Sequence, residues 1–303
     1  MTENPRKKFI LRSVTTVIGI ALALAAIWYA EWTLALMILA LAVFASQELF
    51  TLFEDKGYHP ARYLGITSCL SIIALSALTG TAFHAPFLVA VFVLSFVFLI
   101  LRGASWFPYW DLLETFRREP YPQDLKGPQI ASISDVATTF LGIIYAGWLP
   151  SYIPLLRQLP EVGLAITFLF FGTIFATDVG AYLVGKRFGK HPLIGPLSPK
   201  KTVEGSLGGI ACAVLAAVAI GSAFHLPMQH VVTLAILTSV VAQLGDLSES
   251  MIKRDAGVKD SGSMIPGHGG VLDRVDSFLL AGPIVYYYIV GVWGISGSNL
   301  SPF

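Results

Sequence analysis

Charged side chains gather in one stretch near the carboxyl end of the chain. Ser250–Asp276 reads SMIKRDAGVKDSGSMIPGHGGVLDRVD, whereas only 13% of the 303 residues are charged. Carboxylates beside lysines, arginines and glycine-rich turns are typical of sites that bind a metal ion and a phosphate together. Apolar segments flank the stretch on both sides, so we expect this chemistry at a membrane surface.

A polar stripe runs along the apolar segment that leads into this stretch. Asp246, Glu249, Ser250 and Lys253 are spaced at i, i+3, i+4 and i+7, so they share one face of a helix. Lipid disfavours such a face, which must therefore point to other helices or to a polar cavity. An interhelical hydrogen-bond patch accounts well for Ser250 and poorly for Asp246, which lies deeper in the segment.

A second pair of acids follows a glycine-rich turn. Asp273 and Asp276 are at i and i+3 where the last apolar segment begins. Paired carboxylates offer the hard oxygen atoms that Mg²⁺ prefers. Gly269 and Gly270 let the backbone approach a ligand closely, and His268 can donate to a phosphate oxygen or simply order the turn. A lone histidine in a loop is more often structural.

Two further features lie between residues 170 and 205. Asp178 lies inside an apolar segment, where an ionisable group is costly unless it faces a cavity, a metal ion or a partner such as a lysine on another helix. The run SPKKT (Ser198–Thr202) leads into a helix start and offers hydroxyl, ammonium and backbone N–H groups to an anion. It lacks the GxxxxGK[ST] spacing of a Walker A loop, and a basic loop beside a membrane is also a common topology signal.

The composition fixes the class of protein that must position these residues. The chain is 55% hydrophobic with a mean hydropathy of +0.70, which predicts an all-α, polytopic integral membrane protein. Cys69 and Cys212 both lie in apolar runs, so they support neither a disulfide framework nor a zinc site. We place nine spans near Ser13–Tyr29, Trp32–Leu52, Tyr63–Leu78, Pro86–Leu101, Val136–Tyr152, Val162–Gly185, Gly205–Phe224, His230–Met251 and Val275–Ile295.

The distribution of basic residues gives the orientation. With a cytoplasmic N-terminus, every lysine and arginine except Arg157 falls on the inner side, as the positive-inside rule requires. The charged loops then face the cytosol. Residues 1–135 form an N-terminal region that ends in an aromatic, charged segment, Gly103–Asp135. This segment suits either the membrane interface or an ordinary connector. We expect residues 136–303 to form a second region, which carries the candidate catalytic residues and the cytosolic loops.

The motifs together resemble those of the phosphatidate cytidylyltransferase family, the CDP-diacylglycerol synthases. The run S-x-I-K-R-x4-K-D-x-G-x2-I-P-x-H-G-G-V-x-D-R-V-D, from Ser250 to Asp276, is similar to the C-terminal signature of that family. Ala176–Ser206 and Gln243–Ser250 resemble its other motifs. Residues 1–135 match only in having several apolar spans.

The resemblance implies an enzyme of phospholipid biosynthesis that joins CTP and phosphatidic acid to give CDP-diacylglycerol and pyrophosphate. It implies Mg²⁺ as the cofactor, with or without a second, monovalent cation such as K⁺. We expect a bacterial cytoplasmic (inner) membrane, with the active site facing the cytosol as the distribution of basic residues indicates. A homodimer is a further hypothesis, and no nucleic acid is expected as a partner.

The resemblance also assigns roles to individual residues. The catalytic residues would be Asp246, Asp273, Lys253 and Arg274. The metal ligands would be Asp246 and Asp273, with Asp178 and Asp276 as further candidates. The substrate-binding residues would be Ser198, Lys200, Lys201, Thr202, Arg254, Lys259, His268, Gly269 and Gly270.

Other classes of protein remain open. A cation-coupled transporter also places acids inside the membrane, although the sequence shows no inverted repeat of the kind such folds often have. A transferase that consumes CDP-linked lipids would need a D-x2-D-G-x2-A-R-x8-G-x3-D-x3-D pattern, which this chain lacks. A structural scaffold has no need of four acids at cytosolic helix ends.

Overall fold

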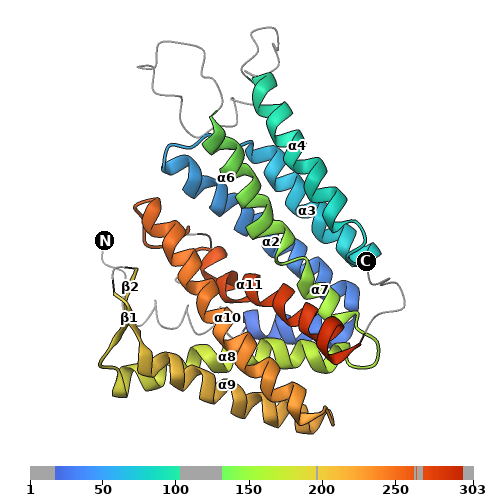
Figure 1. Ribbon diagram of the computed structural model, residues 1–303, viewed down its shortest axis with the longest axis vertical. Helices are drawn as coiled ribbons and strands as arrows, with labels where there is room; N and C mark the ends of the chain where they lie inside the picture. The colour runs from blue at the N-terminus through green and yellow to red at the C-terminus, as the bar shows by residue number, and fades with distance from the viewer. Residues whose placement is uncertain (1–17, 103–131, 196, 263, 265–268, 296–303) are drawn as a thin grey trace.

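The computed structural model describes residues 18–102, 132–195, 197–262, 264 and 269–295, and most of these residues are helical. The elements, shown in Figure 1, are α2 (Glu31–Asp55), α3 (Arg62–Thr79), α4 (His84–Arg102), α6 (Ile133–Ile143), η1 (Ile144–Trp148), α7 (Tyr152–Arg157), α8 (Gly163–Phe188), β1 (Pro192–Ile194), β2 (Ser198–Thr202), α9 (Val203–Ala223), α10 (Met228–Asp255), α11 (Leu272–Tyr288) and η2 (Ile289–Trp293).

Within the described residues, eight helical segments are long and apolar enough to cross a membrane. They match the last eight predicted spans, with α6, η1 and α7 forming the single segment Ile133–Arg157. The first predicted span, Ser13–Tyr29, is described only from residue 18, and Ile18–Tyr29 is an apolar helix shorter than a span. Most of the predicted interfacial segment Gly103–Asp135 lies outside the described residues. The all-α, polytopic membrane fold is therefore confirmed.

Small residues bring α8 and α9 into close contact along their length (Figure 1). A Cβ added at Gly180 of α8 would come 2.6 Å from the Cβ atom of Cys212, and one added at Gly209 of α9 would come 2.9 Å from the carbonyl oxygen of Thr177. Such glycines let two helix backbones approach where lipid supplies no hydrophobic force between them. The antiparallel hairpin β1–β2 joins the two helices, so the SPKKT run lies at one end of this pair.

The start of α6 is fixed by a reciprocal cap. The N–H group of Ser132 donates to the Asp135 carboxylate at 2.8 Å, and the N–H group of Asp135 donates back to the Ser132 hydroxyl at 3.2 Å. This exchange satisfies N–H groups that a helix start leaves unpaired. The Asp135 carboxylate also accepts from the N–H group of His59 at 2.7 Å, which ties α6 to the turn before α3.

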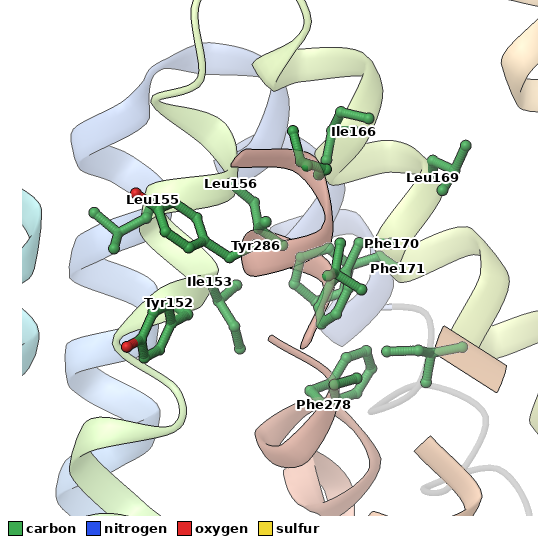
Figure 2. Close-up of a cluster of buried hydrophobic side chains, with 14 of the residues drawn as sticks. Tyr152, Ile153, Leu155, Leu156, Ile166, Leu169, Phe170, Phe171, Phe278 and Tyr286 are labelled. Atoms are coloured by element: carbon green, nitrogen blue, oxygen red, sulfur yellow. The ribbon is translucent and has the colours of Figure 1, made fainter. Parts of the chain in front are cut away.

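A core of aromatic and aliphatic side chains packs α7, α8 and α11 together (Figure 2). The rings of Phe171 and Phe278 lie 5.1 Å apart between α8 and α11, and the Tyr152 and Tyr287 hydroxyls lie 2.8 Å apart between α7 and α11. These contacts hold α11 over most of its length. Figure 2 labels Tyr152, Ile153, Leu155, Leu156, Ile166, Leu169, Phe170, Phe171, Phe278 and Tyr286.

The backbones of α10 and α11 also approach closely, beside the candidate site. A Cβ added at Gly245 of α10 would come 2.5 Å from the carbonyl oxygen of Asp276 and 3.3 Å from the Cα atom of Ser277. Only a glycine leaves room for this approach. The contact sets the position of the first turns of α11 relative to the polar stripe on α10.

Candidate active site

Three carboxylates meet where α10 passes the start of α11. Asp246, Glu249 and Asp276 each offer one oxygen atom, and these atoms all lie within 4.8 Å of one another. Glu249 is 0% exposed and Asp276 is 8% exposed. Asp246 and Glu249 meet because they lie one turn apart on α10, and the approach at Gly245 brings in Asp276. We call these three residues the acidic cluster.

Lys253 links the acidic cluster to the start of α11. Its ammonium group makes an ion pair with the buried carboxylate of Glu249 and lies 2.6 Å from Asp273 Oδ1. The other carboxylate oxygen of Asp273 accepts from the N–H groups of Ser261 at 3.0 Å and Gly270 at 2.9 Å. The structure thus places Asp273 beside the cluster through Lys253. Its expected role as a metal ligand stays a prediction.

The SPKKT run reaches the acidic cluster through one lysine. Lys201 Nζ lies 2.5 Å from Asp246 Oδ2, which connects the hairpin to α10. The hydroxyl of Thr202 accepts from the N–H group of Gly205 at 3.1 Å and caps the start of α9. The predicted anion cradle therefore contributes Lys201 to the site, while the Thr202 hydroxyl supports a helix.

Asp178 and Arg274 lie close enough to the cluster to interact with it electrostatically. Asp178, on α8, is within electrostatic range of the carboxylates of Asp246 and Asp276, and of the cations Lys201 and Arg274. It is an exposed side chain of its helix. All four predicted metal ligands are therefore neighbours, although Asp178 is not among the three whose oxygen atoms converge.

The other predicted substrate-binding residues lie at the edges of this region. Lys200 and Lys259 are exposed, and Ser198 is partly exposed at the start of β2. Arg254 Nη1 donates to the carbonyl oxygen of Val258 at 3.1 Å, just after the end of α10. Their proposed contacts with phosphate groups stay predictions.

The structure describes the last two residues of the glycine-rich turn, Gly269 and Gly270. Gly269 has a φ angle of 84°, which strongly favours glycine. Gly270 is buried, and its N–H group donates to Asp273. His268 lies outside the described residues. The turn therefore needs its two glycines for conformation and for space.

The family resemblance assigns no role to two residues, Glu249 of the acidic cluster and Tyr145 beside it. Glu249 was part of the polar stripe, yet its periodicity alone did not separate it from a packing residue. Tyr145 lies in the π-helical turn η1, and its buried hydroxyl has no hydrogen-bond partner within the described part of the chain. This hydroxyl lies within electrostatic range of all three carboxylates of the acidic cluster. Turns of π-helix are frequent at functional sites, although no sequence pattern announced this one.

The acidic cluster fits a divalent cation. Its donor atoms are carboxylate oxygens, which hard cations prefer. Glu249 Oε1 is buried without a hydrogen-bond partner among the described residues. A buried carboxylate oxygen left in that condition is costly, and a bound cation compensates for it.

Comparison with known proteins identifies the family. The family model of the cytidylyltransferase family matches residues 10–292. A phosphatidate cytidylyltransferase of Synechocystis sp. is 36% identical over 307 residues, covering 92% of this chain and 96% of the relative. Phosphatidate cytidylyltransferase 5, chloroplastic, of Arabidopsis thaliana is 32% identical over 95% of this chain and 73% of its own. A phosphatidate cytidylyltransferase of Bacillus subtilis is 43% identical over 52% of this chain and 60% of its own.

The chain therefore belongs to the cytidylyltransferase family. It is a nucleotidyltransferase enzyme embedded in a membrane, as the resemblance implied. Family membership and the acidic cluster both point to the use of a divalent metal ion. Neither the family match nor the relatives support the transporter alternative.

Proposed function

We propose that the protein transfers the cytidylyl group of CTP to phosphatidic acid, giving CDP-diacylglycerol and pyrophosphate. A phosphate oxygen of the lipid attacks the α-phosphorus of CTP. The bond from that phosphorus to the oxygen bridging to the β-phosphorus breaks, and pyrophosphate leaves with the bonding electrons. The observation that carries the proposal is a converging acidic cluster with two lysines paired to it, in a chain of this family.

We propose that the acidic cluster holds the metal ion and that this ion is Mg²⁺. Asp246, Glu249 and Asp276 would hold it, with Asp178 as a neighbouring carboxylate available to a second, monovalent cation such as K⁺. When bound, Mg²⁺ neutralises negative charge that develops on the α-phosphate and on the departing pyrophosphate.

The cations of the site bind the phosphate groups in this proposal. Lys201 and Lys253 lie against the cluster, so either can exchange a carboxylate for a phosphate oxygen of CTP or of the lipid. Arg274 lies in the first turn of α11 near Asp178. The lipid phosphate is already anionic near neutral pH, so the reaction needs no strong general base and can proceed by direct displacement.

We further propose that this site faces the cytosol of a bacterial inner membrane. The support is the distribution of basic residues, together with the position of Lys201 in the hairpin before α9, of Lys253 in the last turn of α10 and of Arg274 in the first turn of α11. On this view residues 136–303 carry the chemistry and residues 1–135 support it. We also propose a homodimer, which the molecular mass in mild detergent would test.

The test is pyrophosphate release by purified protein in detergent, with CTP, phosphatidic acid and Mg²⁺ each omitted in turn. Release should need all three components and should fall at least about 100-fold in Asp246→Asn, because a metal ligand has lost its charge. Asp255→Asn is the matched control on the same helix, since Asp255 pairs with Lys56 at 3.1 Å, with 57% of the Asp255 side chain exposed. Folded wild-type protein that releases no pyrophosphate, or a fully active Asp246→Asn variant, would contradict the proposal.

A further inference from the structure

Glu48 is a buried acid on α2, far along the chain from the signature stretch. It is 6% exposed, and its carboxylate accepts three hydrogen bonds from residues more than 200 positions away. The hydroxyl of Ser261 donates at 3.0 Å, the N–H group of Val271 at 2.9 Å and that of Leu272 at 2.8 Å. No motif that we identified in the sequence includes this residue.

Two of these donors belong to the start of α11. Val271 is the N-cap residue and Leu272 is the first helical residue, so neither N–H group has an intrahelical partner. The positive end of the helix dipole also favours a carboxylate at this position. Glu48 therefore satisfies the helix that carries Asp273 and Asp276, and it does so from a different part of the bundle.

A second carboxylate closes the same loop. Asp273 accepts from the N–H groups of Ser261 and Gly270, while Glu48 accepts from the hydroxyl of Ser261 and the N–H group of Val271. The residues on either side of positions 263–268 are thus held together by two acids, one from α2 and one from α11. Among the hydrogen bonds described for these residues, those of Glu48 are the ones that connect them to the N-terminal part of the chain.

The glycines of the stretch fit around Glu48. A Cβ added at Gly262 would come 2.7 Å from Glu48 Oε1, and one added at Gly270 would overlap both Glu48 Oε2 and the Ser261 hydroxyl. A side chain at either position would have to displace the carboxylate. These glycines are therefore needed to admit Glu48 as well as to shape the turn.

We infer that Glu48 is a positioning residue for nucleotidyl transfer, which holds the residues flanking positions 263–268 and the first turn of α11 in place beside α10. The inference rests on the proposed function for its catalytic meaning. Because Asp273 and Asp276 leave the same turn, movement of that turn would displace the carboxylate that completes the acidic cluster and the one that pairs with Lys253. Glu48 itself need not touch substrate.

The test uses Glu48→Gln, which keeps the shape of the side chain and removes its charge and one acceptor oxygen. Glu54→Gln is the matched control on the same helix, where Glu54 pairs with Arg62 at 2.8 Å. Two readouts are made on full-length protein in detergent. They are hydrogen exchange resolved at the amides of Val271 and Leu272, and kcat and KM for CTP and for phosphatidic acid.

We expect exchange at the amides of Val271 and Leu272 to rise about 10- to 100-fold in Glu48→Gln, in line with the loss of charge-assisted hydrogen bonds. The value of kcat/KM for CTP should fall by a similar factor, and Glu54→Gln should match the wild type in both readouts. Glu48→Asp, which keeps the charge, should recover part of the loss. This pattern would support the inference.

Three results would overturn it. The first is unchanged exchange and unchanged kinetics in folded Glu48→Gln. The second is a lower melting temperature with unchanged exchange at these two amides, since Glu48 would then support only the bundle. If Glu48→Gln does not fold, Ser261→Ala is measured in its place. The third refuting result would be a folded Ser261→Ala variant whose amides at Val271 and Leu272 exchange no faster than those of the wild type. Exchange does not require turnover, so an inactive wild type would refute the proposed function and leave this inference to be decided by exchange alone.

Discussion

Replacement of Lys253 by methionine gives the sharpest test of the charge balance in the site. The lysine side chain is 12% exposed and lies between Glu249, which is 0% exposed, and Asp273, which is 9% exposed. Methionine keeps most of the volume and removes the charge. Two buried carboxylates then lose their common cation, next to Asp246 and Asp276.

The size of the effect follows from this burial. Breaking a buried ion pair by removing one partner costs about 3–5 kcal/mol, because the other charge stays buried without compensation. We therefore expect Lys253→Met to melt several degrees below the wild type in EDTA. Mg²⁺ at 100 times its Kd stabilises a folded protein by about 2.7 kcal/mol, and its affinity should rise when a competing cation is removed. Mg²⁺ should thus raise the melting temperature of the variant more than that of the wild type.

The assay is thermal unfolding in detergent, in EDTA and across a series of Mg²⁺ concentrations. Lys56→Met is the matched control, because Lys56 pairs with Asp255 at the surface, with 40% and 57% of the two side chains exposed. Exposed pairs of this kind contribute about 1 kcal/mol or less. The reasoning is refuted if Lys253→Met has the same melting temperature as the wild type in EDTA. It is also refuted if Mg²⁺ stabilises both proteins equally.

Two other substitutions probe the surroundings of the cluster. Lys201→Ala should raise KM for CTP or for phosphatidic acid roughly tenfold, because a cation beside Asp246 is lost. Unchanged kinetics for both substrates would mean that the SPKKT run serves only as a topology signal. Tyr145→Phe should melt at or slightly above the wild-type temperature, since it removes a buried hydroxyl that has no hydrogen-bond partner in the described structure. A decrease of more than about 1 kcal/mol in the free energy of unfolding would reveal a partner for that hydroxyl.

Helical periodicity was enough to predict one side of the site. The spacing of Asp246, Glu249 and Lys253 placed them on one face, and the structure brings the two acids to a common point with Lys253 paired to the second. Periodicity could not rank Asp273 against Asp276, because both lie in the first turns of α11. The close backbone approach at Gly245 determines that Asp276 joins the acidic cluster.

Contacts between residues far apart in the sequence could not be predicted. Glu48 bonds to residues that follow it by 213 to 224 positions, and no local pattern encodes such a pairing. The sequence does carry a signal, since an acid within an apolar span such as Trp32–Leu52 is functional by default, but hydropathy does not identify its partners. For Tyr145 the chain offered no signal, because neither the π-helical turn nor the absence of a partner can be inferred from composition.

The pairing of cations with acids explains how one site can accept such highly charged substrates. Lys201 and Lys253 each contact a carboxylate in this structure, so the described site holds little unbalanced positive charge to offer CTP. Lys253 can turn to a phosphate only if Glu249 and Asp273 gain another cation, because a buried acid left alone is costly. Metal binding and nucleotide binding should therefore favour each other through Lys253. Removal of Lys253 should weaken that coupling while it increases the affinity for the metal ion.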